Sequence, residues 1–175
     1  MHLRAADKSN IHAIASLHAA NWRRAYRGTL SEEYLVDHVI TDRLATWERR
    51  LSSPVAGQFI TVAEESGQLV GFACGFADSD PVWGTLLDNI HVALPNQGQG
   101  VGSELLRQIA RWCMTEAPDQ GLYLWVNQSN ITAQHFYAFL GAKNVGSDVW
   151  NSPDGGIVPT FRYAWRHVRD LLPRG

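Results

Sequence analysis

A short loop with alternating glycines could bind a phosphate. Gln97-Gly-Gln-Gly-Val-Gly102 follows an apolar segment that ends at Pro95, and a helical pattern begins directly after it. Backbone N–H groups at the start of a helix point toward an anion, and the helix dipole adds about half a positive charge there. Gly98, Gly100 and Gly102 have no Cβ, so a ligand can lie close to the main chain. The loop lacks the Lys-Ser/Thr ending of a Walker A loop, which argues against nucleoside triphosphate hydrolysis.

A dinucleotide-binding fingerprint is one interpretation of this loop, because Gly98-Gln-Gly-Val-Gly102 approximates G-x-G-x-x-G. That motif belongs after the first strand of a parallel βαβ unit. Here several strand patterns precede the loop, and two of them are joined by Ser66-Gly67, a turn signal typical of an antiparallel hairpin. The order of elements therefore disfavours a nicotinamide oxidoreductase, which NADH binding would reveal.

The elements that must position this loop alternate in a way that indicates an α+β fold. Val101, Leu105 and Ile109 recur at helical spacing after the loop, on one face of an amphipathic helix. The predicted order is strand, helices, three strands, helix, strand, helix and two strands, which favours a mixed, mainly antiparallel sheet. We expect strands near residues 3–6, 58–65, 68–77, 83–94, 122–127, 142–150 and 157–166, and helices near residues 11–26, 31–35, 41–51, 101–112 and 133–140.

Composition narrows the class of protein. The chain has 175 residues, of which 45% are apolar, and this predicts one domain over residues 1–175 with a sizeable core. The net charge of -2 gives no electrostatic argument for nucleic acid, and no apolar run reaches membrane-spanning length. The first residues carry no signal-peptide pattern, and Cys74 and Cys113 fit buried thiols, so we expect a cytoplasmic protein. The histidines lack metal-ligand spacing, and we expect no metal site.

Two segments resemble the signatures of the GNAT superfamily of acyl-CoA-dependent N-acyltransferases. The glycine loop is similar to the family's [Arg/Gln]-x-x-Gly-x-[Gly/Ala] motif. Asn130-Ile-Thr-Ala-Gln-His-Phe-Tyr-Ala-Phe-Leu-Gly-Ala142 is similar to its Asn-x-x-Ala-x-x-Phe-Tyr-x-x-x-Gly-Phe motif and departs from it at Ala142. The resemblance extends from Leu3 to Trp165. It implies a mainly antiparallel sheet of about seven strands flanked by helices, with the fourth and fifth strands splayed.

The resemblance also implies acetyl-CoA as the cosubstrate. Its pyrophosphate would lie on the glycine loop, where Gln97 replaces the commoner Arg and offers hydrogen bonds without charge. The pantetheine arm would lie between the splayed strands, and Asn130 would contact the cofactor, act as a helix N-cap, or do both. The residues expected to bind acetyl-CoA are Val92, Leu94, Gln97, Gly98, Gln99, Gly100, Gly102, Ser103 and Asn130.

Two residues are expected to carry the chemistry by the same resemblance. Tyr137 falls where the family places a phenol near the CoA sulfur, and it could protonate the leaving thiolate; a core tyrosine is the alternative. Asp88 lies four residues before Val92, where several members carry a base; a solvated carboxylate is the alternative. An Asp is a weak base for an ammonium, so a water relay is expected. His91 has the better pKa, but its side chain alternates away from Asp88 unless the strand contains a bulge.

We therefore expect an N-acetyltransferase that moves an acetyl group to a primary amine by direct attack in a ternary complex. No cysteine lies at the expected thioester, so an acyl-enzyme is not indicated. A non-catalytic acyl-CoA-binding or sensing module with the same fold is the alternative, and it would bind CoA without turnover. No nucleic acid or membrane partner is expected, and a homodimer stays open. An aromatic wall for the amine could come from Trp22, Tyr26, Tyr34 and Trp150.

Overall fold

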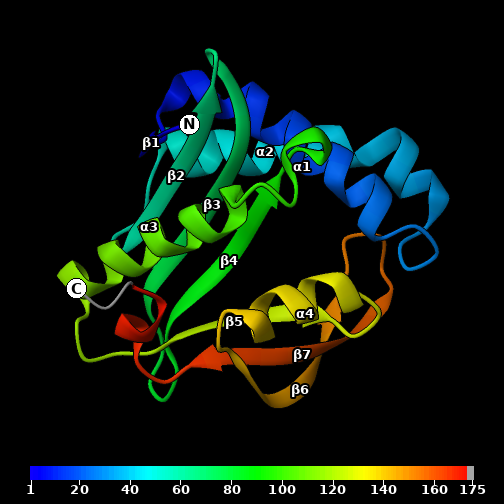
Figure 1. The fold of residues 1–175 in the computed structure, drawn as a ribbon. Coiled ribbons are helices and arrows are strands. Elements are labelled where there is room, and N and C mark those ends of the chain that lie inside the picture. The colour runs from blue at the N-terminus through cyan, green and yellow to red at the C-terminus, as the bar shows by residue number, and fades with distance from the viewer. Residues whose placement is uncertain (173–175) are drawn as a thin grey trace.

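A seven-stranded sheet in the order β1-β2-β3-β4-β5-β7-β6 forms the centre of the molecule (Figure 1). The computed structural model describes residues 1–172. Neighbouring strands pair antiparallel except β4 and β5, which pair parallel, so the predicted mixed, mainly antiparallel α+β sheet is confirmed. The strands are β1 (His2–Ala5), β2 (Gln58–Glu65), β3 (Gln68–Asp80), β4 (Gly84–Val92), β5 (Leu122–Asn127), β6 (Lys143–Asn151) and β7 (Ile157–Trp165).

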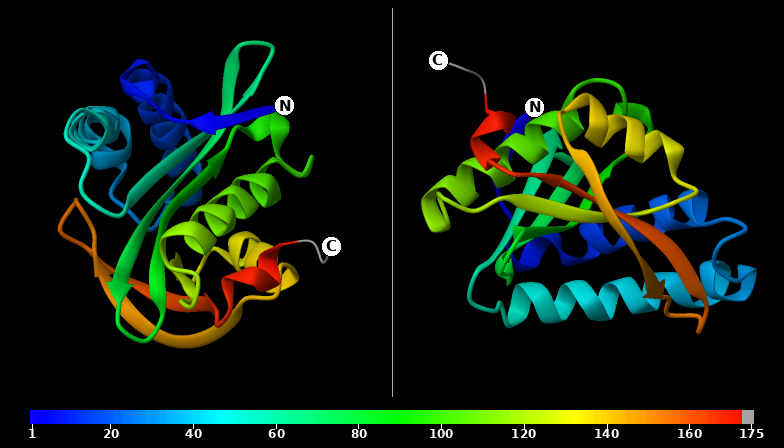
Figure 2. Two further views of the ribbon diagram at one scale, coloured as in Figure 1. Left: turned by 90° about the vertical axis from the view of Figure 1, so that its left-hand side faces the viewer. Right: turned by 90° about the horizontal axis from the view of Figure 1, so that it is seen from below.

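Helices cover both faces of the sheet, as the two views in Figure 2 make clear. One face carries α1 (Ile11–Ala25) and α2 (Val39–Ser52), and the other carries α3 (Val101–Glu116) and α4 (Ile131–Phe139). Each face has its own buried apolar core, because a two-sided sheet must bury both of its surfaces. Within residues 1–172, no helix combines the length and apolar character needed to cross a membrane.

Local sequence accounts for most connections. Ser66 and Gly67 have φ of 50° and 76°, which is the left-handed conformation that a tight hairpin turn requires. The helical stretches expected near residues 31–35 and 41–51 are one continuous element, because the π-helical turn Tyr34–His38 runs directly into α2 with no Gly or Pro between them. β3 continues past the expected turn at residue 78 to Asp80, which pairs with Gly84 of β4.

The parallel strands β4 and β5 stay together only at their first residues. They pair at Thr85–Leu122 and Leu86–Tyr123 and then diverge, as the ribbon in Figure 1 indicates. β4 ends at the loop that leads into α3, and β5 ends just before α4. The opening therefore lies beside the first turns of two helices, at the carboxyl ends of parallel strands, which is where open sheets bind ligands.

Candidate active site

A cavity of about 880 Å³ occupies this opening. Its lining comes from α1, β4, the glycine loop, β5 and α4, so it connects both faces of the sheet. Of the residues expected to bind acetyl-CoA or to carry the chemistry, all except Gln99 line it. The splay of β4 and β5 thus brings together residues that lie far apart in the sequence.

The glycine loop presents unpaired backbone donors to this cavity. Within the described chain, the backbone N–H groups of residues 98–103 make no hydrogen bond of ordinary geometry, and the first helical bond of α3 runs from Glu104 N to Gly100 O at 3.1 Å. Gly98 and Gly100 have φ of 75° and 86°, which side chains other than glycine rarely adopt. Gly102 is also constrained, because a Cβ there would lie 3.2 Å from Cζ of Phe136. These donors and glycines fit a pyrophosphate lying on the main chain.

The two glutamine side chains of the loop brace it against neighbouring backbone. Gln97 Nε2 donates to the Val92 carbonyl at 3.0 Å, and Gln99 Nε2 donates to the Pro95 carbonyl at 2.8 Å. One N–H of the Gln97 side-chain amide is therefore engaged with β4. The backbone donors of the loop and the helix dipole provide the main attraction for an anion here.

Tyr137 lies on α4 at the cavity wall. Its side chain is buried and packs against the rings of Phe136, Tyr163 and Trp165, with ring centroids 5.3, 6.4 and 6.3 Å away. Burial raises the pKa of its phenol, and the nearby Tyr26 raises it further. The phenol is therefore protonated at neutral pH and available as a proton donor. Tyr137 both packs in the core and lines the cavity, so its packing does not exclude the catalytic role.

Asn130 acts as the N-cap of α4, as one of its two expected roles requires. Its Oδ1 accepts a hydrogen bond from the backbone N–H of Ala133 at 3.1 Å. The residue also lines the cavity, as Tyr137 does. The cap fixes the first turn of α4 and, with it, the position of the helix that carries Tyr137.

A β-bulge in β4 changes which face its polar side chains occupy. The register with β3 shifts so that Asp88 and Asn89 together oppose Cys74. Because of this extra residue, Asp88 and His91 both face α1 and α2, whereas regular alternation would have separated them. Asp88 pairs with Arg50 of α2, with Oδ2 2.7 Å from Nη1, and also accepts a hydrogen bond from Asn89 Nδ2 at 2.5 Å. The Arg50 guanidinium and the Asn89 amide thus hold the Asp88 carboxylate in place.

Two histidine rings lie against each other at the α1 side of the cavity, with their planes tilted by 38°. The rings of His18 and His91 lie 4.4 Å apart, and the Trp47 indole donates to His18 Nδ1 at 3.0 Å. An indole nitrogen only donates, so the neutral His18 ring must carry its proton on Nε2. Burial and the charge of Arg43 lower the pKa of His91 to about 3, and burial lowers that of His18 well below its usual value. His91 therefore loses the advantage as a base that its ordinary pKa suggested.

The four aromatic side chains suggested for the amine side lie close together, but only two of them, Trp22 and Tyr26, are among the described residues that line the cavity. The Trp22 ring lies 5.1 Å from Tyr26 and 5.7 Å from Trp150, measured between centroids. Trp22 and Tyr26 line the cavity, whereas Tyr34 is buried behind them and its hydroxyl donates to Asp42. Of the nearby arginines, Arg24 lines the cavity and donates to Asn21 Oδ1 at 2.7 Å.

Several residues of the site carried no signal in the sequence. His18, Asn21 and Arg50 come from the first two helices, and Asn127 ends β5 outside both family motifs. Asn21 Nδ2 donates to the Val92 carbonyl at 3.1 Å, 71 residues away along the chain. Such contacts depend on how α1 packs across β4, and the spacing of residues along the sequence does not predict this packing.

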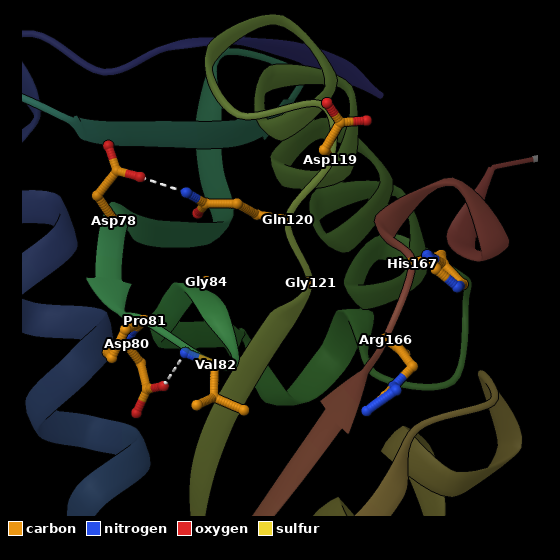
Figure 3. Close-up of a pocket in the computed structure, with 10 residues that line it drawn as sticks. All are labelled: Asp78, Asp80, Pro81, Val82, Gly84, Asp119, Gln120, Gly121, Arg166 and His167. Carbon is orange, nitrogen blue, oxygen red and sulfur yellow. Dashed lines mark hydrogen bonds between the residues drawn. The ribbon is translucent and has the colours of Figure 1, made fainter.

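A second cavity of about 520 Å³ lies where the β3–β4 turn meets the segment before β5 (Figure 3). Two of its acidic side chains, Asp78 and Asp80, are already engaged. Asp80 Oδ1 accepts from the backbone N–H groups of Val82 and Trp83 at 2.8 and 2.9 Å, and Asp78 accepts from Gln120. These contacts stabilise turns, so we place the chemistry in the larger cavity. In the described residues, no three metal-ligating side chains come together.

The fold and the cavity together define a GNAT-type acetyltransferase domain. Residues 12–142 match the family model Acetyltransferase (GNAT) family, and the chain belongs to this family. A Mycobacterium tuberculosis protein named "Probable N-acetyltransferase Rv2775" is 28% identical over 139 residues, which cover 77% of this chain and 75% of that protein.

Solved structures share the fold. A GCN5-related N-acetyltransferase from Rhodopseudomonas palustris has a TM-score of 0.72 and 20% identity, covering 93% of both chains. The protein yncA from Salmonella typhimurium, solved with its cofactor acetyl-CoA, has a TM-score of 0.67 and 19% identity, covering 100% of this chain and 96% of that one. At identities of 19–20%, the similarity to these structures shows the fold alone.

Proposed function

We propose that the protein transfers the acetyl group of acetyl-CoA to a primary amine. The observation that carries the proposal is the single cavity that joins the glycine loop, the splayed strands and the phenol of Tyr137. The loop donors would hold the pyrophosphate, and the arm would run between β4 and β5 toward Tyr137. The amine would enter from the α1 side, past Trp22 and Tyr26.

The transfer takes place by direct attack in this proposal. The amine nitrogen forms a bond to the acetyl carbonyl carbon, the C–S bond breaks, and the thiolate takes a proton from Tyr137. The proton that the amine loses reaches solvent through water near Asp88, and the phenol is reprotonated from the same water. Burial raises the pKa of Cys74 to about 12 and that of Cys113 to about 11, so neither thiol is suited to form an acyl-enzyme.

Asp88 orients the acceptor and its water in this mechanism. Its ion pair with Arg50 fixes the carboxylate on the acceptor face of the β4 bulge. A carboxylate held in this way accepts a hydrogen bond from an incoming amine or from the water that takes its proton. His91 lies on the same face as a neutral ring, and burial makes it a weak base.

The test is release of free CoA thiol from acetyl-CoA in the presence of an amine panel: amino acids, amino acid amides, polyamines, aminoglycosides and peptides with free N-termini. Amine-dependent thiol release supports the proposal. Acetyl-CoA binding by calorimetry without release for any amine would instead support an acyl-CoA sensing module on the same fold.

A further inference from the structure

An unsatisfied hydrogen-bond donor lies on β5 in the cavity wall. Asn127 is only 6% exposed and lines the cavity. Its Oδ1 accepts from the backbone N–H and the hydroxyl of Ser129 at 2.9 and 3.1 Å. Since a backbone N–H only donates, the amide oxygen must face Ser129 and Nδ2 must point the other way. That Nδ2 is buried without a partner among the described residues, which is costly unless a ligand accepts its hydrogen bond.

The strand direction places Asn127 on the acceptor side of the sheet. Leu124 and Val126 belong to the core under α3, whereas the ring of Trp125 lies 4.4 Å from the Arg162 guanidinium on the opposite face. Alternation along β5 therefore puts Asn127 on the face of Trp125, away from α3. The cavity residues of α1 lie on this face.

Asn89 on β4 offers the complementary group. Its Nδ2 donates to Asp88, so its Oδ1 is fixed at the other end of the amide, where it is buried without a partner among residues 1–172. Its neighbour across the strands is Cys74, which belongs to the core under α1 and α2. Asn89 therefore faces the acceptor side as well and lines the cavity. An unpaired acceptor on β4 thus faces the same cavity as an unpaired donor on β5.

We propose that these two amides select the acceptor, and the inference rests on the proposed acetyl transfer. Asn89 Oδ1 accepts from the amine N–H, and Asn127 Nδ2 donates to a carbonyl oxygen beside that amine. The acceptor class is then an α-amino carbonyl compound, such as an amino acid amide or a peptide N-terminus. A simple alkylamine or a polyamine leaves Asn127 unsatisfied. Trp22 and Tyr26 provide an apolar wall that suits an aromatic side group.

The experiment compares L-phenylalaninamide with phenethylamine, which has the same ring and amine but no carbonyl. Asn127→Asp keeps the oxygen that Ser129 binds and replaces the donor with an acceptor of nearly equal size. We expect this variant to lower kcat/KM for the amide about tenfold or more relative to phenethylamine, because the carbonyl then faces an oxygen. Asn127→Ala removes the donor without adding charge and should lower the same ratio.

Gln128→Glu is the matched control, since it makes the same chemical change at the neighbouring residue, which is not among the cavity residues of the described chain. It should leave the ratio of the two probes unchanged. An equal loss for both probes in the Asn127 variants, or a loss of acetyl-CoA affinity by calorimetry, would assign Asn127 to the cofactor and overturn the proposal.

Probe binding separates this inference from the reaction itself. NMR titration of both probes into CoA-loaded protein should give tighter binding of the amide, and Asn127→Asp should remove that preference. This result supports the acceptor assignment even if no thiol is released with any amine. Equal binding of the two probes to the wild-type protein overturns the assignment even if acetyl transfer is observed.

Discussion

At the scale of single residues, Tyr137 gives the sharpest prediction. If its phenol protonates the leaving thiolate, Tyr137→Phe should lower kcat by about 10²-fold or more and leave acetyl-CoA affinity nearly unchanged. Because burial raises the pKa of the phenol, the wild-type rate should not fall through loss of this proton as the pH rises to 10. Steady-state kinetics and calorimetry measure the two quantities.

The control for this change is Tyr123→Phe. Tyr123 is also buried, but it is not among the residues of the described chain that line the cavity, and Arg162 lies over its ring. This variant should keep kcat within about twofold, since the ring and its packing remain. A Tyr137→Phe enzyme with wild-type kcat would instead return Tyr137 to a packing role.

The proton lost by the amine gives a second prediction at this scale. If Asp88 orients the water that takes this proton, Asp88→Asn should lose rate most at mildly acidic pH, where little free amine exists. At high pH the amine arrives deprotonated, and the variant should recover much of its deficit. His91→Gln should leave the pH profile unchanged, because burial holds the pKa of His91 near 3. A flat Asp88→Asn profile with a His91→Gln defect would transfer the role to His91.

The sequence predicts individual site residues only where they belong to a recognisable motif. The two family signatures located the loop glycines, Asn130 and Tyr137, and all of these line the cavity. Asn127 was not predicted, since its importance arises from a buried donor left over after Ser129 engages its oxygen. The low pKa of His91 was not predicted either, because it depends on burial and on Arg43, 48 residues away in the sequence.

At the scale of elements, we predict that a substitution in the glycine loop abolishes acetyl-CoA binding, whereas a similar substitution elsewhere lowers only the stability of the fold. Gly100→Asp should abolish micromolar acetyl-CoA binding, because a carboxylate would face the phosphate at a residue whose φ of 86° disfavours side chains. Gly155→Asp, in the β6–β7 turn, is the matched control, since its φ is 85° and a Cβ at either glycine meets nothing within 4 Å. Calorimetry should detect binding to the control, while thermal unfolding should register a similar loss in both variants. Equal binding by both would remove the anion-site argument.

Elements with strong patterns were predictable, and their irregularities were not. The hairpin at Ser66-Gly67 and the apolar stripe of α3 follow from local spacing. The bulge at Asp88 inserts a single extra residue into β4, and the same sequence would read equally well as a regular strand. That extra residue decides which polar groups of β4 face the acceptor. Predicting the site therefore requires the register of β4 with β3, and the location of the strand alone is not enough.

At the scale of the whole molecule, the two buried histidines link stability to pH. The rings of His18 and His91 are in contact between α1 and β4, and burial lowers the pKa of both below that of an unfolded chain. Histidines of the unfolded chain have a pKa of about 6.5. As the pH falls below it, these histidines bind protons in the unfolded chain, whereas His18 and His91 stay neutral in the folded chain. The contribution of the two neutral histidines to the free energy of unfolding is therefore complete above about pH 7 and declines toward about pH 5. Each histidine contributes at most about 1.4 kcal/mol per pH unit to this slope.

His91→Gln should flatten this slope, and urea unfolding at pH 7.5, 6.5 and 5.5 measures it. The window lies above the ordinary pKa range of carboxyl groups, and hydrogen bonds lower the pKa of Asp7, Asp80 and Asp154 further. His12→Gln is the matched control, since His12 is exposed and its removal should leave the slope unchanged. If His91→Gln and His12→Gln retained the same slope as the wild-type protein, His91 would titrate freely in the folded chain. It would then be accessible enough to serve as the base, and the assignment of the acceptor side around Asp88 would have to change with it.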